Sequence, residues 1–199
     1  PLPPPPLPPY TPLPTMPPPN SPPAPPLASL TEITPISAQL GQPYPGEMGS
    51  RYPASHAIDG DLQSKVLSVS ALSSDQWLSV RLPLGSRVDY VAIYNRNDNN
   101  LYHSWLSPFE LWLGDGPGDT RVQHRCGRNS HYMPLSMGMG PYVVSCNGVS
   151  NLPYVTIILR QGIERYMSFG EVKIFGPPPP PPPPSPQPPP PPPPPSPPP

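Results

Sequence analysis

The stretch Arg87-Val88-Asp89-Tyr90-Val91-Ala92-Ile93-Tyr94 is rich in the β-branched and aromatic side chains that pack well on a pleated sheet. The flanking stretches Gln76–Leu82 and Phe109–Leu113 alternate apolar and polar residues, which is the period of a half-buried strand. Gly, Pro, Asn and Asp loops separate these runs, and no amphipathic helix of useful length interrupts them. The pattern predicts an all-β sandwich, with further strands at 142–146, 154–159 and 171–175.

Proline divides the chain into three parts. Of the 46 prolines among 199 residues, sixteen lie in residues 1–26 and twenty in residues 177–199. Proline fixes φ and lacks an amide hydrogen, so we expect both flanks to form polyproline II rods. At about 3.1 Å per residue the second rod would be roughly 70 Å long. Residues 27–176 are numerous enough to bury one core and are predicted to form a single domain.

Charge and cysteine content limit the function classes. The net charge of −1 gives no indication of a nucleic-acid partner. No apolar run approaches the roughly 20 residues that cross a bilayer. A chain that starts in Pro1-Leu2-Pro3, without an initiator Met, is expected to be a mature or internal fragment of a longer protein. The pair Cys126 and Cys146 predicts a disulfide and an oxidising compartment, and two buried thiols are the alternative.

Several segments resemble discoidin, or coagulation-factor type C, domains and the related fucolectins. The resemblance runs from about residue 30 to 176, in the order and spacing of that family. It implies a galactose-binding-like jelly-roll sandwich of two antiparallel sheets, flanked here by the polyproline rods. The segments that carry it are Ser55–Asp61 (Ala-x-Asp-Gly turn), Trp77–Leu82, Val88–Asp98, Leu106–Asp115, Pro153–Ile157 and Tyr166–Gly176.

The same resemblance implies a calcium site. In fucolectin-like domains calcium lies under the Asp-Gly turn and is closed by the Glu that opens the last strand. Calcium takes six to eight oxygen ligands. The alternative is that Asp59 only caps a turn and Glu171 only accepts hydrogen bonds from amides. The implied ligands are the carboxylates of Asp59 and Glu171, the carbonyls of His56, Asp61 and Gly170, and an oxygen of Ser68 or Ser70.

A glycan site is implied by Arg96-Asn97-Asp98, which matches the Arg-x-Asp of the fucolectins. His103 falls where the family has a second basic residue, and Trp105 and Tyr102 could stack on a sugar or a membrane. The upstream His of the fucose signature has no counterpart, so fucose specificity is not predicted. The alternative is that Arg96 and Asp98 only pair with each other and brace their loop.

The flanks are similar in composition to hydroxyproline-rich glycoproteins of green-algal and plant extracellular matrix, such as pherophorins and extensins. That resemblance implies hydroxylated prolines with O-linked sugars. The positions expected to be modified are Pro178, Pro179, Pro180, Pro181, Pro182, Pro183, Ser185, Pro188, Pro189, Pro190, Pro191, Pro192, Pro193 and Ser196.

Our leading hypothesis from the sequence is therefore structural. The domain would be a bead on glycosylated rods in an extracellular fibre of a cell wall or ciliary surface (mastigoneme), with other copies or other matrix glycoproteins as partners. The alternative is an extracellular glycan-binding lectin module, calcium-dependent if the metal site is real, with the rods as spacers. No Gly-x-Ser-x-Gly elbow, phosphate-binding glycine loop or helical His/Glu pair is present, so no enzyme activity is expected.

Overall fold

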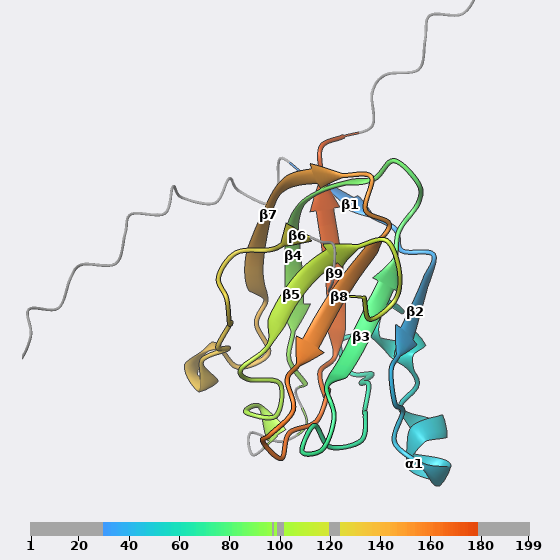
Figure 1. The fold of residues 1–199 in the computed structure, drawn as a ribbon, viewed down its shortest axis with the longest axis vertical. Helices are drawn as coiled ribbons and strands as arrows, with labels where there is room; N and C mark the ends of the chain where they lie inside the picture. Colours follow the sequence, from blue (N-terminus) through green and yellow to red (C-terminus); the bar gives the residue numbers. More distant parts are fainter. Residues whose placement is uncertain (1–29, 97, 99–101, 120–123, 179–199) are drawn as a thin grey trace, which may run out of the picture.

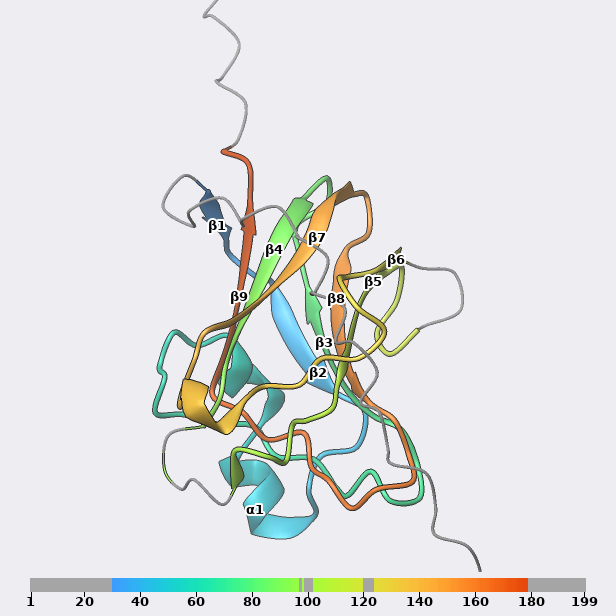
Figure 2. The same cartoon turned by 90° about the vertical axis from the view of Figure 1, so that its left-hand side faces the viewer.

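Two antiparallel β-sheets pack face to face in the computed structural model, which describes residues 30–96, 98, 102–119 and 124–178 (Figures 1 and 2). This arrangement confirms the predicted all-β sandwich. The four-stranded sheet has the order β1 (Thr31–Ile33), β9 (Glu171–Gly176), β4 (Arg87–Tyr94), β7 (Tyr142–Ser150). The five-stranded sheet has the order β2 (Ser37–Leu40), β3 (Gln76–Arg81), β8 (Tyr154–Leu159), β5 (Glu110–Gly114), β6 (His124–Arg125).

Helical structure among the described residues is short. The α-helix α1 spans Gly46–Arg51, and 3-10 turns span Ala54–Ala57 and Leu135–Met137. Within the described part of the chain, no helix is both long and apolar enough to span a lipid bilayer.

Strand β4 is central to its sheet because it pairs with β9 on one side and β7 on the other. Val91 lies opposite Ile174 and also opposite Val144. Val88 and Val91 are both fully buried, although a spacing of three would normally place them on opposite faces. The regular alternation is broken by a register shift between Val88 and Tyr90, where two steps along β4 face four steps along β7.

The core fills the space between the two sheets with alternate side chains of the central strands. Burying each large aliphatic side chain contributes about 1.5–3 kcal/mol. These apolar contacts fix the sandwich, and the loops at its two ends are held by it. The fully buried members include Leu78, Val80, Val91, Ile93, Leu111, Leu113, Val155, Ile157 and Ile174.

A disulfide joins Cys126 and Cys146, as predicted. Cys126 follows β6, at one edge of the five-stranded sheet, and Cys146 lies on β7, at an edge of the four-stranded sheet. The bond therefore ties the two sheets together. Closing a loop with a sequence separation of 20 stabilises the fold by roughly 3 kcal/mol in the chain-entropy model.

Strands β1 and β9, which lie next to the Pro-rich segments in the sequence, meet at the same end of the sandwich. Thr31 of β1 lies opposite Gly176 of β9, and both strands reach the upper end in Figure 1. The opposite end carries α1 and the loops that follow β4 and precede β9. The predicted rods at 1–26 and 177–199 lie outside the described residues except for Pro177 and Pro178, which are exposed, and Pro178 is the one expected modification site among the described residues.

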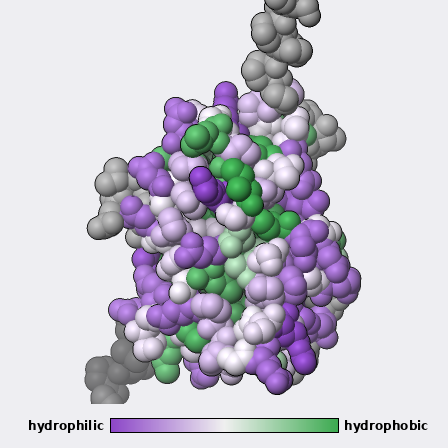
Figure 3. Space-filling view, turned by 90° about the vertical axis from the view of Figure 1, so that its right-hand side faces the viewer, coloured by the Kyte–Doolittle hydropathy of each residue, from purple (hydrophilic) through white to green (hydrophobic). Residues whose placement is uncertain are grey.

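The face that carries β2 shows a narrow band of hydrophobic residues between polar ones (Figure 3). Ile36, immediately before β2, and Leu84, in the turn between β3 and β4, are large exposed apolar residues. A groove of about 510 Å³ lies beside α1 and is lined by Tyr44 and Pro43, among other residues, with no charged side chain. These surfaces lack the paired charges found at the site described next.

Candidate functional site

The candidate site lies where β4 ends and β9 begins. Tyr94 and Glu171 are Cα partners at the ends of these neighbouring strands. The segment after Tyr94 therefore lies beside the segment before Glu171, and a third segment, 56–65, packs against both. Two groups of side chains result, which we name the oxygen cluster and the aromatic pocket.

The oxygen cluster is centred on the hydroxyl of Ser64. Its Oγ is 3.0 Å from His56 O, 3.0 Å from Asp59 Oδ1 and 2.9 Å from Asp61 O. A hydroxyl carries one proton and can donate to only one of these three oxygens. The remaining contacts bring oxygen atoms together without a proton between them, an arrangement that a bound cation would stabilise.

Glu171 adds a buried carboxylate to the oxygen cluster. It is 3% exposed, and Gly60 N lies 3.3 Å from each of its carboxylate oxygens. Burial raises the pKa of Glu171 to about 7, and the nearby charge of Asp59 acts in the same direction. Within the described part of the chain, neither Asp59 nor Glu171 has a salt-bridge partner.

Backbone carbonyls complete the cluster on the side of Gly170. A Cβ at Gly170 would lie 3.3 Å from both Asn95 O and Leu62 O and 3.5 Å from Ser64 O. Among the described residues, no three His, Cys, Asp or Glu side chains gather as metal ligands, so a cation here would take most of its ligands from carbonyl and hydroxyl oxygens. Two carboxylates with carbonyl and hydroxyl oxygens form the mixed oxygen set that calcium uses. The residues present therefore fit calcium.

The structure brings most of the residues predicted as calcium ligands to this cluster and adds Ser64. The hydroxyls of the predicted serines are engaged elsewhere. Ser68 Oγ donates to Val69 O and accepts from Met167 N, and Ser70 Oγ accepts from Leu72 N. Sequence reasoning missed Ser64, although its position three residues after Asp61 is one where a serine often hydrogen-bonds to a local turn.

The aromatic pocket adjoins the oxygen cluster and has a volume of about 290 Å³. Arg96, 9% exposed, lies at its base. Arg96 donates from Nε to Asp98 Oδ1 and from Nη2 to Asp98 Oδ2, both at 2.6 Å, and from Nη1 to Ser168 Oγ at 2.8 Å. The pocket is lined by Met48, Tyr52, Lys65, Val66, Leu67, Arg96, Asp98, Tyr102, Trp105 and Ser168.

A second cation in the pocket comes from Lys65, which sequence reasoning missed. Lys65 Nζ is 2.6 Å from Asp98 Oδ2, so Asp98 holds two cations. The hydrogen bond from Arg96, with that from Lys65, holds the pKa of Asp98 well below its usual range. His103, predicted for the second basic position, is buried, does not line the pocket, and accepts a hydrogen bond at its carbonyl from Asn95 Nδ2.

Tyr102 and Trp105 form an aromatic wall of the pocket, and their rings contact each other at a tilt. The ring of Trp105 lies 4.4 Å from that of Tyr102 and 4.6 Å from that of Tyr166, between centroids. The guanidinium of Arg96 lies 4.3 Å from the centre of the Tyr102 ring, within cation–π range. The pairing of Arg96 with Asp98, which the sequence offered as the alternative to a glycan site, is present, and Trp105 lines the same pocket.

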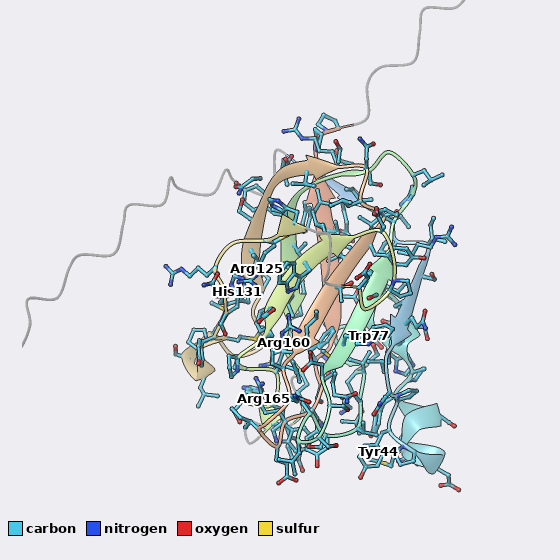
Figure 4. All side chains as sticks on the ribbon, viewed as in Figure 1. Tyr44, Trp77, Arg125, His131, Arg160 and Arg165 are labelled. Carbon is cyan, nitrogen blue, oxygen red and sulfur yellow. A yellow bond between two sulfur atoms is a disulfide. The ribbon has the colours of Figure 1, made fainter. Side chains whose placement is uncertain are left out.

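Two basic residues near Cys126, Arg125 and His131, are labelled in Figure 4, and neither lines the pocket. Arg125 stacks over Trp112 at 4.3 Å and donates to Asn129 Oδ1. His131 is buried against Phe109, and its burial lowers its pKa. These residues have structural partners.

No family model matches the sequence, and no curated protein matches it. Solved structures do resemble it. The F5/8 type C domain of a Bacteroides fragilis protein has a TM-score of 0.59 at 15% identity, over 74% of this chain and 97% of that chain. A family 32 carbohydrate-binding module of Clostridium perfringens, solved with galactose, has a TM-score of 0.53 at 18% identity over 76% and 96%.

This chain has the galactose-binding-like sandwich fold. A striped bass serum fucolectin resembles it as well, with a TM-score of 0.53 at 22% identity, over 70% of this chain and 45% of the fucolectin chain. At these identities the likeness concerns the fold, and it confirms the fold that the sequence motifs implied.

Proposed function

We propose that this domain is an extracellular, non-catalytic glycan-binding module, and that a calcium ion braces its binding loops. The observation that carries the proposal is the aromatic pocket, in which the charged triad of Lys65, Arg96 and Asp98 lies against the contacting rings of Tyr102 and Trp105. Small-molecule sites combine apolar walls with a few fixed polar groups. The carbohydrate-binding modules and lectins with the same fold support this reading.

The chain's own groups would divide the work of binding. Arg96 and Lys65 would donate hydrogen bonds to the oxygens of a sugar ring, while Asp98 keeps both cations in place. Trp105 and Tyr102 would pack against the apolar face of the ring. Because Arg96 is fixed by Asp98 and Ser168 before any ligand arrives, binding would cost little side-chain ordering.

Calcium would be held by the oxygen cluster, with Asp59 and Glu171 as carboxylate ligands, Ser64 as the hydroxyl ligand, and the carbonyls of His56 and Asp61. Bound calcium would supply positive charge that offsets the two carboxylates. The cluster's oxygens come from segment 56–65 and from the start of β9, so the ion would tie these segments together.

The fibre role, in a cell wall or at a ciliary surface, stays a prediction. It depends on the Pro-rich composition of residues 1–26 and 177–199, and its partners would be other copies or other matrix glycoproteins. The disulfide fits an extracellular compartment. The pairing of Thr31 with Gly176 would place both rods at the end opposite the pocket, so that a rod could carry the pocket outward.

The test is glycan-array binding by the whole 199-residue chain, with calcium and then with a chelator. We expect binding to a defined set of glycans that weakens in chelator and is lost in Trp105→Ala. The matched control is Tyr132→Ala, which removes an aromatic ring that is 66% exposed and does not line the pocket. Absence of binding in both conditions would overturn the proposal.

A further inference from the structure

The charge of the aromatic pocket is unbalanced. Among its lining residues, Lys65 and Arg96 are cationic and Asp98 is the one acid. Asp98 stays ionised because Arg96 and Lys65 hold its pKa far below the usual range. The triad therefore carries one net positive charge, in a pocket whose remaining walls are aromatic, apolar or hydroxyl-bearing.

The hydrogen-bonding capacity of the triad is also one-sided. Arg96 has five N–H groups, and its contacts with described residues use three of them. Lys65 has three N–H groups and uses one, on Asp98. Asp98, in contrast, already accepts two hydrogen bonds at Oδ2 and one at Oδ1. The charged groups thus offer a ligand several donors and little accepting capacity.

We infer that the pocket selects an acidic sugar, in which a carboxylate or sulfate group on the ring accepts hydrogen bonds from Lys65 and Arg96. A neutral hydroxyl must both donate and accept to be fully satisfied, whereas an anionic oxygen only accepts. Hydrogen bonds between ionised partners are also about twice as strong as neutral ones. The volume of about 290 Å³ lies at the small end for ligand sites and suits one ring.

Lys65 is the residue that sets this preference. Arg96 is committed to Asp98 by two hydrogen bonds and to Ser168 by one, so its charge is largely balanced in place. Lys65 makes one side-chain hydrogen bond, to the already paired Asp98, its Nζ lies 5.7 Å from the centre of the Tyr52 ring, and 18% of its side chain stays exposed. Its ammonium group can therefore turn toward a ligand without leaving the carboxylate.

The inference rests on the proposed function, and its experiment separates the two. The whole chain is titrated in calcium with trigalacturonate, with neutral galactotriose and with a sulfated galactotriose, by calorimetry. We expect the acidic trisaccharides to bind at least tenfold more tightly than galactotriose, and that preference to shrink as salt is added. Comparing the carboxylated and sulfated ligands identifies which anionic group the pocket takes.

Lys65→Gln is the decisive variant. We expect it to reduce the preference for the acidic ligand about tenfold, the effect of one charge-assisted hydrogen bond, and Lys65→Arg to restore most of it. The matched control is Lys173→Gln, because Lys173 is the other lysine of the chain and pairs with Glu32 away from the pocket. Thermal melts of each variant confirm that it is folded.

Each outcome has a defined meaning. If galactotriose binds as tightly as the acidic ligands, the charge inference is overturned while glycan binding stands. If acidic ligands bind but Lys65→Gln and Lys173→Gln behave alike, the anion binds elsewhere and the inference is overturned. If no trisaccharide binds, the inference is overturned, and the glycan array decides separately whether the proposed function falls with it.

Discussion

Replacing the buried Glu171 by Gln should change stability with a sign that depends on pH and on calcium. Glu171 is 3% exposed, and burial, aided by the charge of Asp59, raises its pKa from 4.5 to about 7. In the unfolded chain this carboxyl ionises near its ordinary pKa. The folded state therefore holds a proton that the unfolded state has already released between these two values, and stability falls as pH rises through that window.

The size of the effect follows from the shift in pKa. Each unit corresponds to about 1.4 kcal/mol, so ionisation of Glu171 costs the calcium-free protein up to about 3.5 kcal/mol. The contribution of the protonated Glu171 carboxyl to the free energy of unfolding is complete below pH 4.5 and is lost by pH 8. Gln carries no charge and keeps an oxygen that can accept from Gly60 N. In chelator, Glu171→Gln should be more stable than the wild type at pH 8, and equally stable near pH 4.

Urea unfolding followed by tryptophan fluorescence, at both pH values, measures these differences. Calcium should reverse the order at pH 8, because a ligand present at 1,000 times its Kd stabilises the wild type by about 4.1 kcal/mol, which exceeds the cost of ionising Glu171, and the variant lacks a carboxylate to bind it. If the variant gains nothing at pH 8 in chelator, the carboxylate of Glu171 is not destabilised by burial. If calcium stabilises both proteins equally, Glu171 is not a ligand.

Two further perturbations address the sheets and the pocket. Replacing Cys126 and Cys146 together by Ser should lower the free energy of unfolding by about 3 kcal/mol, measured by urea denaturation, and an unchanged midpoint would contradict the role given to the bond. Asp98→Asn should weaken glycan binding about tenfold because Arg96 loses its charged partner. Wild-type binding, measured by calorimetry in saturating calcium, should stay constant between pH 8 and pH 6, because Asp98 stays ionised over that range. A fall in affinity over that range would contradict it.

The strands that could be predicted from sequence are those whose own residues are rich in β-branched and aromatic side chains or alternate apolar and polar residues. Residues 87–94 and 154–159 have the predicted bounds because their β-branched side chains face a core on one side or both. Strand β7 runs on to Ser150, beyond the predicted end at 146. The cause is Asn147-Gly148, a pair typical of a hairpin turn, which here takes positive φ where the register with β4 shifts.

Strands β1, β2 and β6 were missed because they depend on partners far away in the sequence. Strand β2 is short and mostly exposed, and only its pairing with β3 makes it a strand. Strand β6 has two residues, which pair with Trp112 and Leu113 of β5. No local periodicity exists in such segments, so tertiary contacts alone define them.

The residues of the candidate site likewise divide into those that a local motif predicts and those that only the fold brings together. Arg96 and Asp98 lie two positions apart, and their pairing could be anticipated from the motif. Lys65 and Ser64 lie about thirty positions earlier and reach the site only because segment 56–65 packs against the ends of β4 and β9. His103, which the spacing placed in the pocket, is buried instead. Spacing along a loop therefore located the pocket but not its second cation.

The oxygen cluster and the aromatic pocket are built from the same three segments, 56–65, 94–98 and 168–171. In the first segment, Ser64 of the oxygen cluster is followed directly by Lys65 of the pocket. His56 Nδ1 donates to the carbonyl of Lys65 at 3.1 Å. In the second, the carbonyl of Asn95 faces the cluster while the adjacent Arg96 forms the base of the pocket. Calcium need not touch the sugar to affect its binding. By fixing segment 56–65 against the start of β9, calcium would fix the position of the Lys65 ammonium group. That group is the source of the proposed selectivity for an acidic sugar.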